Sequence, residues 1–252
     1  MAGFLVAAFG SGWAIAVDAA SFFLAASLVA LMRLPRTAGQ SANFVHDLAA
    51  GWREFRSRTW LWVIVLQFSF LLMVCTGAVS VLGPVVADEE LGGPTAWGAI
   101  LTGEAAGLLA GGLLGLRFRP RRMLLAATLA ILAFPLLPLA LSFPLALPAI
   151  VALGFAAGVG AEAFGVLWHT TMQQEIPPDK LSRVYSYDAL GSIGLVPLGY
   201  VLAGPIAEAI GVRATLWGAA AIGVAVTLPV LAVRDVQRLE RRAVAAAVTP
   251  SL

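Results

Sequence analysis

Residues 164–211 read FGVLWHTTMQQEIPPDKLSRVYSYDALGSIGLVPLGYVLAGPIAEAIG, and this stretch decides the fold. It holds the end of one apolar run, a short polar connector, and a second apolar run that stops at an acidic edge. The connector contains the Pro177–Pro178 pair, Asp179 and Lys180, and it is too short to form a soluble domain. Two long apolar segments joined by so short a polar link predict a hairpin of membrane helices.

The composition agrees with a membrane protein. Of the 252 residues, 60% are hydrophobic and 12% are charged, whereas soluble domains carry about 25% charged residues. Cys75 is the single cysteine, which excludes an internal disulfide and a Cys-rich metal site. The net charge is +2, but the basic residues lie in links between apolar runs and form no stripe with interleaved aromatics. A nucleic-acid partner is therefore not expected.

Seven apolar runs are each long enough to cross about 30 Å of hydrocarbon. Pro135 and Pro138 should kink the fourth run, because each proline removes a backbone donor. We expect an all-α membrane protein with seven full transmembrane helices, embedded in a lipid bilayer. The runs are residues 13–32, 60–84, 95–116, 123–141, 145–168, 187–207 and 214–233.

The basic residues predict the orientation. When alternate links are assigned to opposite sides, one side holds residues 33–59, 117–122, 169–186 and 234–252, with fifteen of the sixteen lysines and arginines. The opposite links hold only Arg213, together with four acidic residues. The positive-inside rule then predicts a multi-pass plasma membrane protein with a cytoplasmic C-terminus and an outside N-terminus. The acidic residues are Asp88, Glu89, Glu90 and Glu208.

The longest link, residues 33–59, contains an amphipathic pattern. Phe44, Leu48, Trp52 and Phe55 follow one another at steps of four, four and three residues, which is the period of one helix face. A basic amphipathic helix of this kind lies along the lipid headgroups. A solvated linker helix is the alternative.

Four glycines, Gly103, Gly107, Gly111 and Gly115, repeat every four residues along the third run. Such a face lets a neighbouring membrane helix approach closely, so we interpret it as a packing surface. A substrate-binding role is the alternative, and in a transporter the same groove can be a sliding surface.

Ionisable residues inside membrane spans often mark transport pathways. Glu104 lies nine residues into its run, about 14 Å deep and near the bilayer midplane, which makes it the best candidate for a proton-carrying group. A neutral glutamate hydrogen-bonded between helices is the alternative. Asp18 and Glu162 are shallower and favour structural pairing, while Asp188 and His169 lie at the cytoplasmic mouth.

No catalytic constellation is present, and we expect no enzyme, cofactor or metal site. There is no phosphate-binding loop, and neither of the two histidines, His46 and His169, has a partner at metal-ligand spacing.

The link GLLGLRFRPRR, residues 112–122, is similar to the loop signature of the major facilitator superfamily. Leu116 stands where the signature usually has an acid, and Arg119–Pro120 replaces the usual glycine and arginine. The positions that match the signature are Gly112, Arg117, Arg121 and Arg122.

The connector and following helix resemble the C-terminal half of exporters in that superfamily, closest to the macrolide and siderophore exporters in their actinobacterial-like form. The segment WAIAVDAASFFLAASLVALMRLP is similar to the sixth helix of these exporters, and DLAAGWREFRSRTWLW to their central loop entering the seventh. The resemblance implies a twelve-helix, proton-driven exporter of drug-like or siderophore-like molecules. This chain would supply the end of helix five through helix twelve.

The resemblance also implies the organisation of the chain. We expect the end of one helix and one full helix in residues 1–32, a cytoplasmic link in 33–59, a six-helix bundle in 60–233, and a cytoplasmic tail in 234–252. Such transporters bind small amphipathic substrates between two six-helix halves, so a missing N-terminal half is an expected partner. A truncated remnant is an alternative. A seven-helix receptor is another, although residues 214–233 contain no lysine for a retinal Schiff base.

Overall fold

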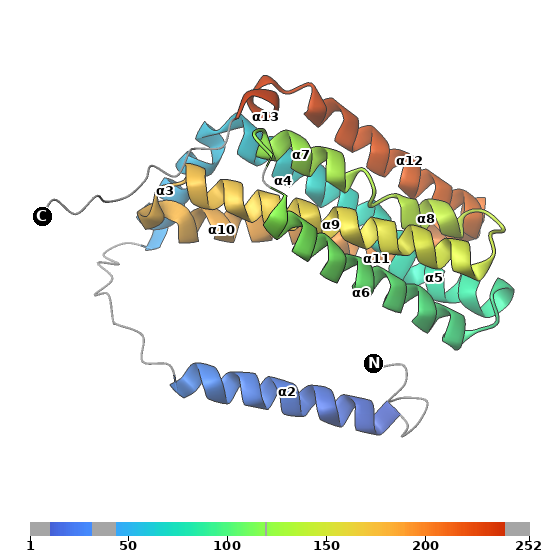
Figure 1. The fold of residues 1–252 in the computed structure, drawn as a ribbon. Coiled ribbons are helices and arrows are strands. Elements are labelled where there is room, and N and C mark those ends of the chain that lie inside the picture. Colours follow the sequence, from blue (N-terminus) through green and yellow to red (C-terminus); the bar gives the residue numbers. More distant parts are fainter. Residues whose placement is uncertain (1–10, 32–43, 119, 240–252) are drawn as a thin grey trace, which may run out of the picture. The chain divides into compact units, whose positions relative to one another are not determined.

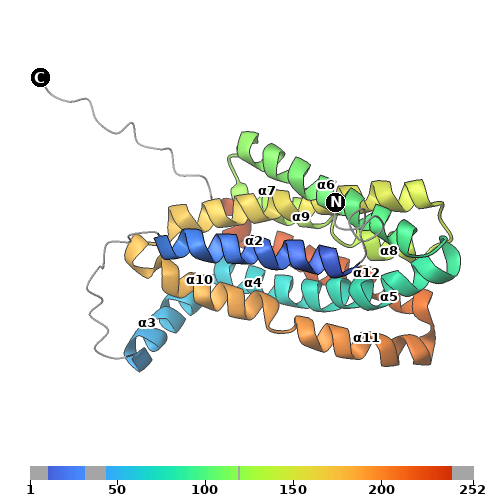
Figure 2. The ribbon, with the colours of Figure 1, turned by 90° about the horizontal axis from the view of Figure 1, so that it is seen from below.

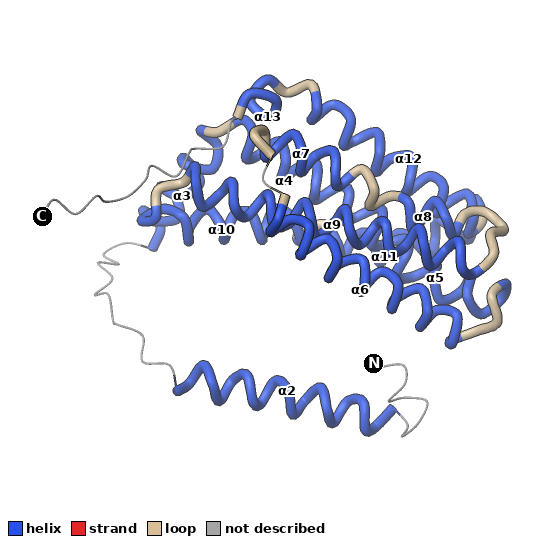
Figure 3. Tube along the Cα trace, in the orientation of Figure 1, coloured by secondary structure: helices blue, strands red, loops and turns tan. Residues whose placement is uncertain are grey.

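The structure is a computed structural model that describes residues 11–31, 44–118 and 120–239 (Figure 1). The chain divides into two compact units, Met1–Phe44 and Val45–Leu252, and each unit is described by itself. Within the described ranges every regular element is a helix, and no strand occurs (Figure 3).

The first unit contains helix α2, Ser11–Leu31. Its apolar portion, Ile15–Leu31, is shorter than 18 residues, and about 20 residues are needed to cross the hydrocarbon core. The expectation of a seventh full span at residues 13–32 is therefore corrected to a short apolar helix.

The second unit contains six helical stretches long and apolar enough to cross a membrane. Two of them are formed by several elements in line, and a third is interrupted in its middle. The first span consists of α4 (Thr59–Leu71), the π-helix η1 (Leu72–Thr76) and α5 (Gly77–Glu90). The second span is α6 (Pro94–Arg117), and the third is α7 (Met123–Ile131) with α8 (Leu136–Leu141). The fourth span is α9 (Leu147–Glu175), the fifth is α10 (Pro178–Ile193) with α11 (Val196–Ile210), and the sixth is α12 (Val212–Leu231). Two further helices, α3 (Phe44–Ser57) and α13 (Arg234–Arg238), flank these spans.

The predicted kink in the fourth run is confirmed. Helix α7 ends at Ile131 and α8 begins at Leu136. The interruption therefore covers the four residues that end with Pro135. A proline ring clashes with the preceding turn and offers no N–H to it, which explains why the break lies there.

The polar connector of the opening sequence stretch is more helical than expected. Helix α9 continues through Glu175 and α10 already begins at Pro178, so only Ile176 and Pro177 lie between the two helices. The 29 residues of α9 span about 43 Å at 1.5 Å per residue, which exceeds the hydrocarbon thickness of about 30 Å. Helix α9 is therefore longer than the hydrocarbon layer is thick.

Helices α6 and α9 touch through their backbones. A Cβ atom built on Gly107 would lie 2.9 Å from the carbonyl carbon of Phe155, and one on Gly111 would lie 2.9 Å from the Cα of Val159. Any side chain at these two positions would force the helices apart. The other two glycines of the row, Gly103 and Gly115, lie against Val151 and Val166.

The contact is reciprocal and fixes the register. A Cβ on Gly158 of α9 would overlap the carbonyl oxygen of Glu104 and come within 2.9 Å of the Leu108 nitrogen. Because residue numbers rise together along both helices, α6 and α9 run in the same direction. Small residues that admit such an approach allow membrane helices to associate by close packing.

A second close crossing joins η1 and α5 to α11. A Cβ on Gly77 would lie 2.6 Å from the carbonyl carbon of Gly199, and one on Gly199 would overlap the carbonyl oxygen of Met73. The π-helix Leu72–Thr76 lies at this crossing. The first and fifth spans are therefore held together by backbone contact at the place where the first span departs from α-helical geometry.

We predict that Gly107→Ala destabilises the bundle by about 1–3 kcal/mol, because the added methyl group overpacks the α6–α9 contact. Thermal unfolding of the purified chain in detergent measures the effect. Gly98→Ala on the same helix is the matched control, since a Cβ there meets nothing within 4 Å and alanine favours a helix over glycine. Equal thermal stability of the two variants would show that the backbone contact is not tight.

Candidate functional site

A cavity of about 130 Å³ lies inside the described bundle, between the first span, α6 and the α7–α8 span. Most of its wall is apolar, but it also receives one carboxyl group, two hydroxyl groups and an indole ring. The residues that line it are Cys75, Thr76, Val79, Ser80, Trp97, Leu101, Glu104, Phe134, Leu137 and Pro138.

Glu104 supplies the carboxyl group of this cavity. It is the eleventh residue of the 24-residue helix α6, about 15 Å from the start of that helix, and it is half-buried. Among the described residues, no side chain donates a hydrogen bond to its carboxyl group and no cation pairs with it. The glycine contact at Gly158 holds the backbone of Glu104 against α9, so the residue has a fixed position while its carboxyl group has no fixed partner.

Glu162 lies on α9 at the same helix–helix contact but at a different depth. Its Cγ would be 3.4 Å from a Cβ built on Gly112, and Gly112 is eight residues beyond Glu104 along α6. That spacing is about 12 Å along the helix axis. The structure therefore does not bring the two carboxyl groups together.

Asp188 is buried, with 8% of its surface exposed. The Trp168 indole Nε1–H donates a hydrogen bond to one carboxylate oxygen over 3.2 Å, and the Ser192 hydroxyl group donates to the other over 3.3 Å. These two side-chain donors satisfy the Asp188 carboxylate oxygens inside the bundle. His169 is exposed and lies beside the ring of Tyr185, with 5.6 Å between ring centroids.

Trp168 also belongs to a row of aromatic rings between α4 and α9. Its ring stacks with Phe164 at 6.1 Å and meets Trp60 edge-on at 5.6 Å, and Phe164 stacks with Phe68 at 4.9 Å. Aromatic pairs at these separations stabilise beyond the area they bury. The row packs the first span against the fourth and holds the indole that binds Asp188.

The remaining candidates lie outside the cavity. Asp18 is exposed on α2 in the first unit. Arg117 is exposed in the last turn of α6, where a cation favourably meets the negative end of the helix dipole. Arg121 and Arg122 are exposed between α6 and α7, and the chain brings none of these arginines to Glu104.

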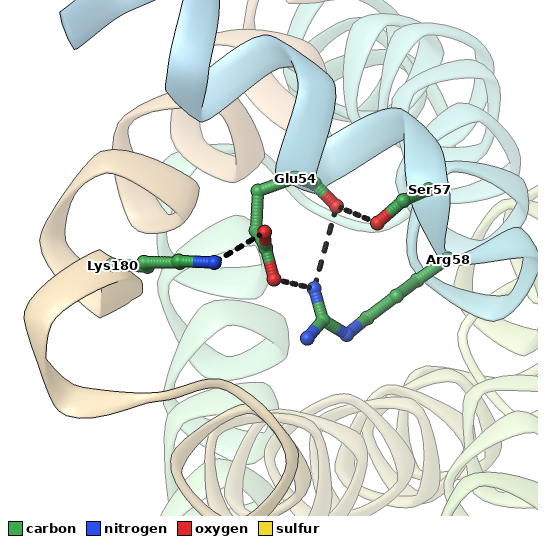
Figure 4. Close-up of polar contacts among 4 residues, drawn as sticks. All are labelled: Glu54, Ser57, Arg58 and Lys180. Atoms are coloured by element: carbon green, nitrogen blue, oxygen red, sulfur yellow. Dashed lines mark hydrogen bonds and ion pairs between the residues drawn. The ribbon is translucent and has the colours of Figure 1, made fainter.

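Helix α3 docks on α10 through one carboxylate. Lys180 donates a hydrogen bond to Glu54 over 2.9 Å, and Arg58 forms an ion pair with the other oxygen of the same carboxylate (Figure 4). Hydrogen bonds from Lys180 and then from Arg58 hold the pKa of Glu54 below its usual value. The charged form of Glu54 therefore links α3 to the start of the fifth span.

Apolar contacts reinforce this docking. Phe55 is buried, and the ring of Trp52 lies 5.6 Å from the ring of Tyr187. A Cβ on Gly51 would lie 3.0 Å from the Tyr187 ring. The predicted helix in the long link is confirmed, and the part of it that carries these residues packs on the bundle rather than being solvated all round. Figure 2 shows α3 at the end of the bundle where α10 begins.

The opposite end of the bundle carries its own ion pair. Arg213, at the start of α12, binds Glu90, at the end of α5, through two guanidinium nitrogens. A fork of this kind is a strong form of arginine–carboxylate pairing. Arg213, the single basic residue in the acidic links, therefore joins the last span to the first through this ion pair.

Residues 1–250 match the profile of a family described as transmembrane secretion effector. The chain belongs to this family of the major facilitator superfamily. Together with the six apolar helices, the match shows a multi-pass membrane transporter in a lipid bilayer. No curated protein and no solved structure matches the chain.

Within the described part of this chain, no group of three His, Cys, Asp or Glu side chains could hold a metal ion. Sequence reasoning missed the ion pairs at both ends of the bundle and two buried hydrogen bonds. One of these hydrogen bonds is the Trp168–Asp188 bond, and the other joins Gln67 Nε2 to the Thr227 hydroxyl over 2.9 Å inside the bundle. Gln67 and Thr227 are isolated polar residues within apolar stretches, and nothing in the sequence pairs them.

We predict that Glu54→Gln loosens α3, so that its backbone amides exchange hydrogen for deuterium about two- to fivefold faster at pH 7, the range expected for a partly exposed ion pair. The pKa of Glu54 is lower in the folded chain than its usual value of 4.5. The stabilisation of α3 by the charged carboxylate is therefore complete above pH 4.5 and is lost as the pH falls through the lower pKa of the folded state. The ratio of the exchange rate in Glu54→Gln to that in the wild type should therefore approach one in acid.

Glu89→Gln is the matched control, because it removes the same charge from an exposed position at the opposite end of the bundle. Exchange in α3 should be unchanged in that variant. A pH-independent ratio for Glu54→Gln would contradict the proposed role of the charged carboxylate.

Proposed function

We propose that the bundle is one half of a proton-coupled secondary transporter that exports small amphipathic molecules. Membership of the transmembrane secretion effector family supports transport. Transporters of the major facilitator superfamily consist of two six-helix halves with the substrate site near the bilayer midplane between them. The resemblance to macrolide and siderophore exporters favours drug-like or siderophore-like cargo and export across the plasma membrane.

One observation carries the proposal of proton coupling, namely the position of Glu104. Its carboxyl group lines a cavity at mid-span depth, and no described side chain binds it. Ionisable groups inside membrane spans are costly and mark ion and proton pathways. A carboxyl group without a fixed cation can bind a proton in one conformation and release it in another, as water reaches it from either side.

The high exposure of two spans supports the presence of a second six-helix half. The α10–α11 span and α6 are the least enclosed, with 17% and 22% of their most apolar windows buried, against 50% for the α7–α8 span. Their outer faces are available to lipid or to another bundle. We propose that a second six-helix half covers the side on which α6 and α10–α11 lie and completes the substrate site beside Glu104.

The charge distribution supports an orientation. The links next to α3, α7, α10 and α13 hold nearly all of the lysines and arginines, and the opposite links hold Glu90 with its partner Arg213. By the positive-inside rule, the end with α3 and α13 faces the cytoplasm. Cargo would then leave the cell toward the end that carries Glu90.

We predict that Glu104→Gln abolishes transport driven by a pH gradient, because glutamine cannot carry the proton. The assay measures dye accumulation in inverted vesicles from cells that express this chain with an N-terminal six-helix half. Dye equilibration without a gradient should persist, since the cavity keeps its size. Glu208→Gln, an exposed acid on α11, should leave both activities unchanged, and full gradient-driven transport by Glu104→Gln would refute the proposal.

A further inference from the structure

A second hollow lies far from Glu104, between α3 and α10. It has a volume of about 330 Å³ and is lined by residues of both helices, namely Gly51, Arg53, Glu54, Ser57, Lys180 and Arg183. Arg53 and Ser57 also line an adjoining, more open hollow with Trp52 and Arg56. The two hollows therefore share two lining residues of α3, and together we call them the recess.

The recess is strongly basic. Its walls carry four cations, Arg53, Arg56, Lys180 and Arg183, and one carboxylate, Glu54. Lys180 and Arg58 already bind that carboxylate, whereas Arg53 and Arg56 are exposed. Lining cations outnumber lining carboxylates in the recess, which favours an anion, and arginine forks match the oxygens of a phosphate group.

The position of the recess selects the anion. Helix α3 ends at Ser57 and the first membrane span begins at Thr59, so the recess lies at the level where the membrane surface is expected. Trp52 has 48% of its surface exposed, and its ring stacks on Phe55 and lies tilted beside Tyr187. Tryptophan at a membrane–water interface places its ring among the headgroups. The anions concentrated at that level are the phosphates of phospholipids.

We propose that this recess binds the headgroup of an anionic phospholipid. Arg53 and Arg56 from α3, with Lys180 and Arg183 from α10, surround the phosphate, and the exposed face of Trp52 lies against the glycerol and upper acyl region. Basic pockets between helix ends on the cytoplasmic side bind such headgroups in membrane proteins. The lipid would join α3 to α10 alongside Glu54. This site does not depend on proton transport by Glu104.

The test measures lipid retention by the full chain in detergent, titrated with phosphatidylglycerol or phosphatidylcholine and observed by native mass spectrometry. The wild-type chain should bind phosphatidylglycerol in preference to phosphatidylcholine. The double variant Arg53→Gln/Arg56→Gln should bind phosphatidylglycerol more weakly, by about fivefold for each charge removed. Both arginines are exposed, so gel filtration should show an unchanged folded chain.

The matched control is Arg234→Gln/Arg238→Gln. It removes the same charge from exposed positions on the helix α13, which lines neither hollow, and its affinity should equal that of the wild type. Equal weakening by the two double variants would show a diffuse charge effect and no site. Equal binding of both lipids by the wild type would also overturn the proposal.

Discussion

The backbone contact between α6 and α9 is the constraint on which the rest of the bundle depends. In a bilayer, apolar surfaces gain little by leaving lipid for one another, so close packing of small residues must hold the helices. Gly107, Gly111 and Gly158 allow that approach. Because Gly158 lies directly against the Glu104 carbonyl group, the same contact sets the depth at which a carboxyl group enters the cavity.

Much of this fold was predictable because it follows from one-dimensional patterns. Run length predicts the spans, the four-residue glycine repeat marks a face suited to close packing, and Pro135 predicts the break before α8. The predictions that failed concern where individual helices begin and how long they are. Residues 178–186 are polar, yet they form the first turns of α10, since a helix continues past the apolar layer wherever water can meet its polar side chains. The apolar length of α2, by contrast, fell short of a full span.

The site was predictable only in part. The depth of Glu104 follows from counting residues, but the cavity around it requires side chains from three spans that the sequence does not pair. Asp188 illustrates the difficulty, because its partner Trp168 lies 20 residues earlier, across the α9–α10 hairpin. The ion pairs that fasten the two ends, Glu54 with Lys180 and Arg213 with Glu90, likewise join residues more than a hundred positions apart.

The most direct test of the half-transporter is dye efflux from cells that express this chain alone or together with an N-terminal six-helix half. The membrane level of each chain is checked through a tag. We predict efflux only when both halves are present, because the substrate site lies between two bundles. Efflux by this chain alone would contradict that arrangement and indicate a self-paired assembly. No efflux from the pair, with both chains in the membrane and a range of dyes tried, would instead favour a non-functional remnant.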